Sequence, residues 1–218
     1  MHMKKIVLGA ALLFFTTAGF AQELEPVKID SLVTVSLPSD YSKTDTLNQQ
    51  VYSANGDFGY MVVVKAADET NKPLAKEKDL NKVMNNYVDN FKQQYKDASA
   101  QNVRDTTVGK LKARAFTLEY RADDSSVQFK NFVLLYTTTA SYFFEYAYPG
   151  MRAGVIGNEL KTFLTSIKLS PELQRNDQYL SNDTGMSPVI KTGLIAGGSL
   201  LVVAMVIVFI NKRKNALA

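Results

Sequence analysis

The chain has 218 residues, with 25 Lys and Arg against 21 Asp and Glu, no cysteine, and a single histidine at position 2. The absence of cysteine excludes disulfides, a thiol nucleophile and thiolate metal sites. The lone histidine lies in a segment that we expect to be removed, so His-dependent triads and His-ligated metals or haem are excluded as well. Carboxylate catalysis, a Ser-Lys pair and an all-oxygen calcium site are the alternatives left open. Our expectation is that the chain has no cofactor and no enzymatic activity.

Residues 1–21 have the three parts of a secretory signal peptide. Lys4 and Lys5 are followed by a short apolar run and then by small residues that end at Ala21. The apolar run is shorter than the roughly 20 residues needed to span a bilayer. We expect cleavage after Ala21, so that the mature chain begins at Gln22; an uncleaved anchor is the alternative.

The mature chain is close to neutral once its ends are set aside. Two of the basic residues lie in the signal and three lie in 211–218, which leaves 20 basic against 21 acidic residues and a net charge of −1. No basic strip with interleaved aromatic residues points to nucleic acid. We therefore expect no nucleic-acid partner.

Residues 22–170 read as one extracytoplasmic domain that begins with strands. Residues 28–37 alternate apolar and polar side chains, as a strand does. The sequence Asn55-Gly56-Asp57 separates two further apolar segments, 49–54 and 58–66, and Asn-Gly favours the tight turn of a hairpin.

The rest of the domain alternates between helical and strand patterns. Residues 79–95 place apolar side chains at helical spacing, and residues 154–167 do the same. Between them we expect four strands, at 102–108, 112–121, 127–138 and 141–148. The order of three strands, a helix, four strands and a helix predicts an α+β fold with an antiparallel sheet and helices packed on it.

One predicted strand is unusually aromatic. Tyr142, Phe144, Tyr146 and Tyr148 alternate and therefore share a face, and Tyr136 is expected to lie beside them. These five residues are our candidate surface for a ligand or partner, because Tyr suits half-wet sites. The competing interpretation is that they form core beneath a helix.

The chain after the domain divides into three parts. Residues 171–191 are polar and lack apolar periodicity, which predicts a flexible tether. Residues 192–210 form an uncharged apolar run of 19 residues, about 28 Å long as a helix, which predicts one transmembrane helix. The basic residues in 211–218 predict a cytoplasmic tail.

The predicted membrane helix contains a further motif. Gly193 and Gly197 have the G-x-x-x-G spacing that allows two membrane helices to approach, so a weak homodimer through this helix is one alternative. Whether the helix is retained, or removed after export as a sorting signal, is left open by the sequence.

Three passages resemble the PsbP-like and DcrB-like α/β/α sandwich. They are the early strand 33–38, the helix in mid-chain, and residues 163–169 after the aromatic strand. The resemblance implies a non-catalytic accessory or binding role and brings no active-site residues with it. The region from Phe20 to Gln22 also resembles the cleavage sites of exported proteins of Bacteroidetes.

Together these features predict a binding or assembly-accessory module. It would be tethered to the cell membrane by a single pass, with its domain on the periplasmic side and another envelope protein as its partner. The alternative is a small-ligand or lipid binder. Its cavity would lie between sheet and helix and would be lined by Tyr87, Phe91, Tyr142 or Tyr146.

Overall fold

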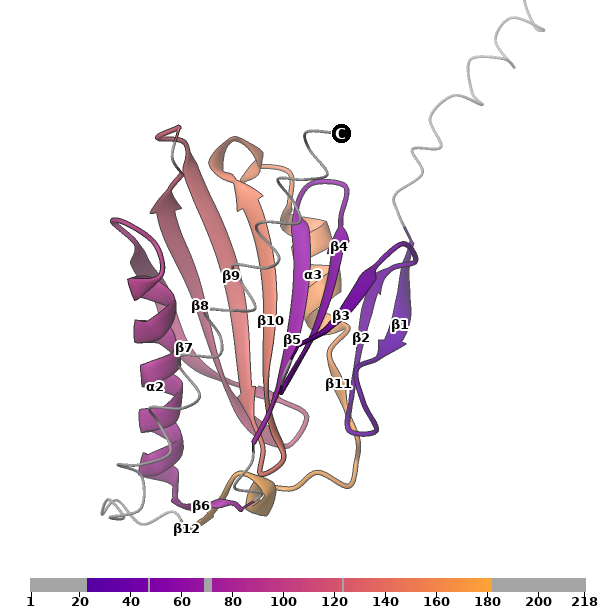
Figure 1. The fold of residues 1–218 in the computed structure, drawn as a ribbon, viewed down its shortest axis with the longest axis vertical. Helices are drawn as coiled ribbons and strands as arrows, with labels where there is room; N and C mark the ends of the chain where they lie inside the picture. Colours follow the sequence, from indigo (N-terminus) through magenta and orange to yellow (C-terminus); the bar gives the residue numbers. More distant parts are fainter. Residues whose placement is uncertain (1–22, 47, 69–71, 123, 182–218) are drawn as a thin grey trace, which may run out of the picture.

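The computed structural model describes residues 23–46, 48–68, 72–122 and 124–181 (Figure 1). The strands are β1 Leu24–Lys28, β2 Val33–Pro38, β3 Ser42–Thr46, β4 Gln49–Asn55, β5 Tyr60–Ala67, β6 Leu74–Lys76, β7 Ser99–Val108, β8 Leu111–Arg121, β9 Val127–Tyr136, β10 Ala140–Pro149, β11 Lys168–Leu169 and β12 Tyr179–Ser181. The helices are α2 Glu77–Gln93 and α3 Gly157–Thr165, with short 3-10 turns η1 Gly150–Arg152 and η2 Arg175–Asp177.

The centre of the domain is a seven-stranded sheet in the order β3-β4-β5-β10-β9-β8-β7. Every neighbouring pair in it is antiparallel. The hairpin expected around Asn55-Gly56-Asp57 joins β4 to β5, with the Gly56 N–H donating to the Gly59 carbonyl at 2.8 Å. The middle strands, β5 and β10, are paired on both sides, which suits their continuous apolar sequences.

Helix α2 packs on one face of this sheet, against β7, β8 and β9. Its stripe of Leu80, Val83, Met84, Val88 and Phe91 is buried, as the helical spacing predicts. The helix lies within two residues of its predicted bounds at each end.

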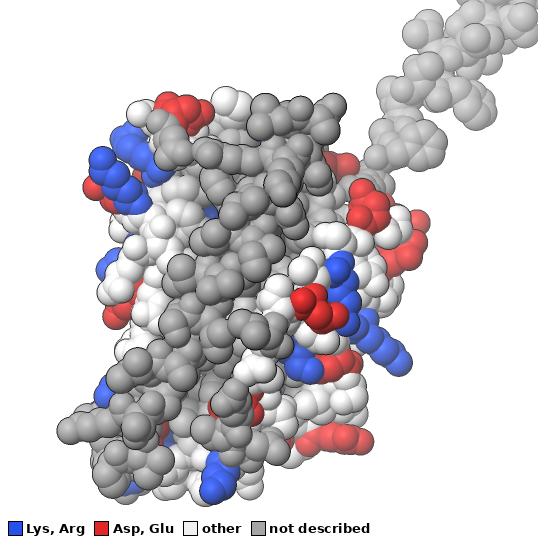
Figure 2. Space-filling model, in the orientation of Figure 1, with Lys and Arg blue, Asp and Glu red and all other residues white. Residues whose placement is uncertain are grey.

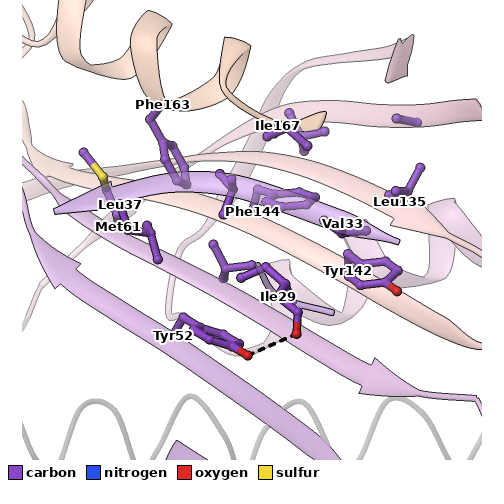
Figure 3. Packing of buried hydrophobic residues seen from close by; sticks show 14 of the residues in the cluster. Ile29, Val33, Leu37, Tyr52, Met61, Leu135, Tyr142, Phe144, Phe163 and Ile167 are labelled. Carbon is purple, nitrogen blue, oxygen red and sulfur yellow. Dashed lines mark hydrogen bonds between the residues drawn. The ribbon is translucent and has the colours of Figure 1, made fainter. Parts of the chain in front are cut away.

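The opposite face is covered by α3 and by a small three-stranded sheet in the order β1-β2-β11 (Figure 1). Alternate residues of β2, Val33, Val35 and Leu37, are buried against the large sheet. Figure 3 shows this packing, with the Tyr52 hydroxyl of β4 donating to the Ile29 carbonyl at 3.1 Å. The domain is therefore layered on both faces of the sheet, and the predicted antiparallel α+β class is confirmed.

The single strand predicted at residues 28–37 is wrong, because this range holds the end of β1, a turn and most of β2, and β1 pairs with β2 as an antiparallel hairpin. The chain reverses at Asp30, whose Oδ1 accepts the backbone N–H groups of Leu32 and Val33 at 2.8 and 2.9 Å. A short polar side chain that bonds its own backbone two and three residues on is a turn former, and here it interrupts the alternation.

The domain also extends beyond its predicted end. Residues 171–181, which the sequence analysis assigns to the tether, contain η2 and β12, and β12 pairs in parallel with β6. The fully buried Gln178 side chain fixes this segment: its Oε1 accepts the Lys112 N–H, and its Nε2 donates to the carbonyls of Lys112 and Tyr136, all within 2.9 Å. The domain therefore continues past residue 170, at least as far as Ser181, the last residue that the structure describes here.

The predicted signal peptide, the remaining tether at 182–191, the apolar segment 192–210 and the basic tail lie outside the described residues. Among the described helices, neither α2 nor α3 combines the length and apolarity needed to cross a bilayer. Figure 2 shows acidic and basic side chains interspersed over the described part of the visible face.

Candidate functional site: the two sides of β10

Strand β10 carries the aromatic residues that the sequence singled out. Tyr142, Phe144 and Tyr146 are completely buried, on the face of the sheet that lies under β2 and α3. They form core, so they cannot act as a surface for a partner in the folded domain. Tyr148 is half-buried and stacks on Phe129 of β9, with ring centroids 5.4 Å apart.

Tyr136 does not join these residues. In the β9–β10 register it lies opposite Ser141, and directly paired residues share a face, so Tyr136 projects to the α2 side. There its hydroxyl donates to Asp68 Oδ2 at 2.8 Å. Burial, and then the Asp68 carboxylate, raise the pKa of Tyr136 well above its usual value, so this phenol stays protonated.

The residues expected to line a ligand cavity lie on opposite faces of the large sheet. Tyr87 and Phe91 of α2 face one side of the sheet, whereas Tyr142 and Tyr146 face the other. Tyr87 and Phe91 pack edge-on against Phe143 of β10, with ring centroids 4.9 and 5.8 Å away. The four residues therefore do not line one cavity.

A shallow depression lies elsewhere, where α2 ends and the chain turns toward β7. Its volume is about 390 Å³, and its lining residues are Asp89, Lys92, Gln93, Tyr95, Asp97 and Ala98. The lining is mostly charged and polar, unlike the largely apolar lining of typical small-molecule sites.

Asp30 joins the small sheet to the large one. Its Oδ2 accepts a hydrogen bond from the Tyr142 hydroxyl at 2.7 Å and forms an ion pair with Lys65 Nζ at 2.8 Å. Its Oδ1 accepts backbone N–H groups of the β1–β2 turn. Burial by itself would raise the pKa of Asp30, but Lys65, Tyr142 and the backbone N–H of Leu32 together hold it below 3.8. Oδ2 therefore holds the β1–β2 hairpin onto the large sheet, while Oδ1 stabilises the turn of the hairpin itself.

A second carboxylate in β10 forms a buried ion pair. Glu145 Oε1 lies 2.6 Å from Lys130 Nζ of β9, and both side chains are largely buried on the α2 side. The Lys130 ammonium lies over the Tyr95 ring, 5.1 Å from its centroid, and this ring packs in a tilted arrangement against Tyr120, with centroids 4.3 Å apart. Although burial alone would lower the pKa of Lys130, the nearby Glu145 raises it, so the ammonium stays charged. Sequence reasoning missed this pair, although Glu145 interrupts an otherwise uncharged strand and could have signalled it.

The far end of β10 meets the tip of the β4–β5 hairpin. The Phe58 N–H donates to Glu159 Oε2 at 2.9 Å, and Arg152 Nη1 donates to the Phe58 carbonyl at 3.1 Å. Three apolar side chains near these contacts are exposed: Met151 by 91%, Val155 by 55% and Phe58 by 39%. We call Phe58, Met151 and Val155 the apolar tip.

The described residues include no group of three His, Cys, Asp or Glu side chains placed to hold a metal ion. The buried acids described above are each bound to a neighbouring side chain. The arrangement offers ion pairs and turn contacts that stabilise the fold, and exposed apolar side chains at Phe58, Met151 and Val155.

No protein-family model and no curated protein matches the chain. Among solved structures, it is similar to the Ran-binding protein Mog1p of Saccharomyces cerevisiae, with a TM-score of 0.45, 10% identity and coverage of 68% of this chain and 96% of Mog1p. It is also similar to cyanobacterial PsbP from Synechocystis, with a TM-score of 0.44, 15% identity and coverage of 71% and 96%.

A structure from Bacteroides thetaiotaomicron gives a TM-score of 0.40 and 10% identity; the match covers 64% of this chain and 46% of the other, so this chain spans less than half of it. The presence of a PsbP structure among these proteins agrees with the resemblance expected from the sequence.

Proposed function

We propose that this chain is a non-catalytic binding or assembly-accessory module that docks onto another envelope protein. The observation that carries the proposal is the apolar tip. Met151 and Phe58 are large apolar side chains left in water, on two segments that hydrogen bonds join, and exposed apolar surface of this kind marks sites of protein interaction.

The tip is held in place by the rest of the domain. Hydrogen bonds join Phe58 to Arg152 and Glu159, so the hairpin and the segment after β10 present one preformed surface. A preformed surface loses little conformational entropy on binding, which favours affinity.

The location that we propose is the extracytoplasmic face of a cell membrane. It is supported by the signal-like residues 1–21 and by the apolar segment 192–210 with its basic flank. The described domain ends at Ser181, which leaves ten residues, 182–191, to link it to the membrane helix.

Crosslinking in intact cells, followed by affinity purification of the full chain and mass spectrometry, tests this function. We expect one reproducible envelope partner, and Met151→Lys should abolish its recovery because a charge then replaces the most exposed apolar side chain. Lys161→Met is the matched control, since Lys161 is an exposed residue of α3 that is not part of the tip. Recovery of the same partner with Met151→Lys would refute the apolar tip as its docking site, and recovery of no partner would refute the proposed function.

A further inference from the structure

The α2 side of the large sheet carries an apolar strip on β4 and β5 whose three valines are buried, although α2 packs mainly on other strands. The strip consists of residues on β4 and β5 that share this face: Val51, Tyr60, Val62, Val64 and Ala66. Helix α2 packs on β7, β8 and β9, toward the other edge of the sheet (Figure 1). The other described helix, α3, packs on the opposite face. An apolar sheet face requires a covering layer, so the strip is a docking surface.

One end of the strip carries an amide without a partner. Gln49 of β4 lies opposite Ala66 of β5 and is buried, yet neither Oε1 nor Nε2 has a hydrogen-bond partner among the described residues. Leaving such a group unsatisfied costs about 1–3 kcal/mol. The occupant of the strip should therefore be polar at this end and apolar along the rest.

The described chain leaves the domain at this same end of the sheet. The register aligns Gln49, Ala66, Ser141 and Tyr136 in one row across four strands. The Gln178 side chain donates to the Tyr136 carbonyl, and β12 follows directly after Gln178. The residues that come next, 182–191, are mostly polar, and residues 192–210 are apolar. This order matches the strip, which has the Gln49 amide at this end and apolar residues along the rest.

The lengths also agree. Strand β5 has eight residues and spans about 26 Å, while a helix of 19 residues spans about 28 Å. A helix that presents Gly193 and Gly197 can approach a flat sheet closely, because neither residue has a side chain. The ten linking residues reach up to about 35 Å and keep the two surfaces at an effective concentration in the millimolar range.

We propose that residues 192–210, when they are outside a bilayer, pack as a helix on the Val51–Val62–Val64 strip, with the polar residues 182–191 meeting Gln49. Insertion into a membrane withdraws this helix and uncovers the strip. The inference deepens the proposed function, on which it rests, because it adds a second apolar surface that only the membrane-anchored protein presents.

The natural chain lacks cysteine, so introduced cysteines can report this contact without interference. Val62→Cys is combined in turn with a single cysteine at positions 201, 202, 203 and 204, in the chain of residues 22–218. Under mild oxidation in water, we expect an intramolecular disulfide at one or two of the four positions, because a docked helix turns only one face toward the strip. The disulfide should be lost in vesicles of phosphatidylethanolamine and phosphatidylglycerol.

Two further sets of cysteine pairs control for misfolding and for disulfides that form by chance collision. Val64→Cys repeats the measurement at a neighbouring strip residue, and Lys161→Cys on α3 serves as the control that should form no disulfide. Equal yields at all four positions, equal yields with Lys161→Cys, or no disulfide with either valine would overturn the proposal. A disulfide between two molecules would overturn it as well, in favour of a second copy as the occupant. Partner recovery from cells is measured separately, so the proposed function can survive the failure of this contact.

Discussion

Asp30 provides the sharpest test of how the small sheet is held on the domain. We consider Asp30→Ala, which removes the acceptor of the Tyr142 hydroxyl and the counter-ion of Lys65. It also removes the side-chain acceptor of two backbone N–H groups in the β1–β2 turn. Tyr142 is fully buried, so its hydroxyl would be left without a partner at a cost of about 1–3 kcal/mol. Loss of the turn contacts adds about 1 kcal/mol, by analogy with the loss of a helix cap.

We therefore expect Asp30→Ala to lower the free energy of unfolding by about 3 kcal/mol, or the melting temperature by roughly 6–12 °C for a domain of this size. Urea unfolding of residues 22–181, followed by circular dichroism, measures this change. Asp45→Ala is the matched control: its ion pair with Lys43 is exposed on β3 at 3.7 Å, so we expect a change below about 1 kcal/mol.

The same side chain makes the stability depend on pH with a defined sign. The pKa of Asp30 is lower in the folded domain than in the unfolded chain, so its contribution is complete above about pH 4. The contribution is lost as the pH falls through the folded pKa, because protonation then costs the ion pair. The stability difference between the natural domain and Asp30→Asn should therefore narrow below pH 4. A difference that stays constant from pH 7 to pH 3, or an Asp30→Ala variant as stable as the natural domain, would refute the role assigned to Asp30.

Two other substitutions test the packing of β10. Gly59→Ala would place its Cβ 2.5–2.7 Å from atoms of the Tyr146 phenol, so we expect thermal unfolding to show a loss of about 1–3 kcal/mol of stability. Gly157→Ala is the control: its Cβ meets no atom within 4 Å, so the change should be neutral or slightly stabilising. Lys130→Met leaves the Glu145 carboxylate buried without its partner, so we expect a loss of about 3–5 kcal/mol in urea unfolding, most of which the second change Glu145→Leu should restore. Additive losses in that double variant would contradict the ion pair, and an unchanged Gly59→Ala would contradict the close approach of the hairpin to β10.

The amino-acid sequence by itself determined the local structure and the excluded chemistry. The absence of cysteine and of histidine beyond position 2 removes whole classes of catalytic and metal sites, whatever the fold. The helix α2 follows from the spacing of its apolar residues, and the β4–β5 hairpin from Asn55-Gly56. These features depend on neighbours within a few positions, where propensity and periodicity are informative.

Only the tertiary structure decided which surfaces these elements bury. Alternation along β10 predicts that Tyr142, Phe144 and Tyr146 share a face, but not that α3 and β2 cover it. The register of β9 against β10, and not the sequence spacing, sends Tyr136 to the other side. The polar composition of residues 171–181 gives no sign that Gln178 is buried. Its side chain holds that segment on the domain through hydrogen bonds to backbone atoms of distant strands. Such pairings join residues up to 130 positions apart, so a local pattern carries no information about them.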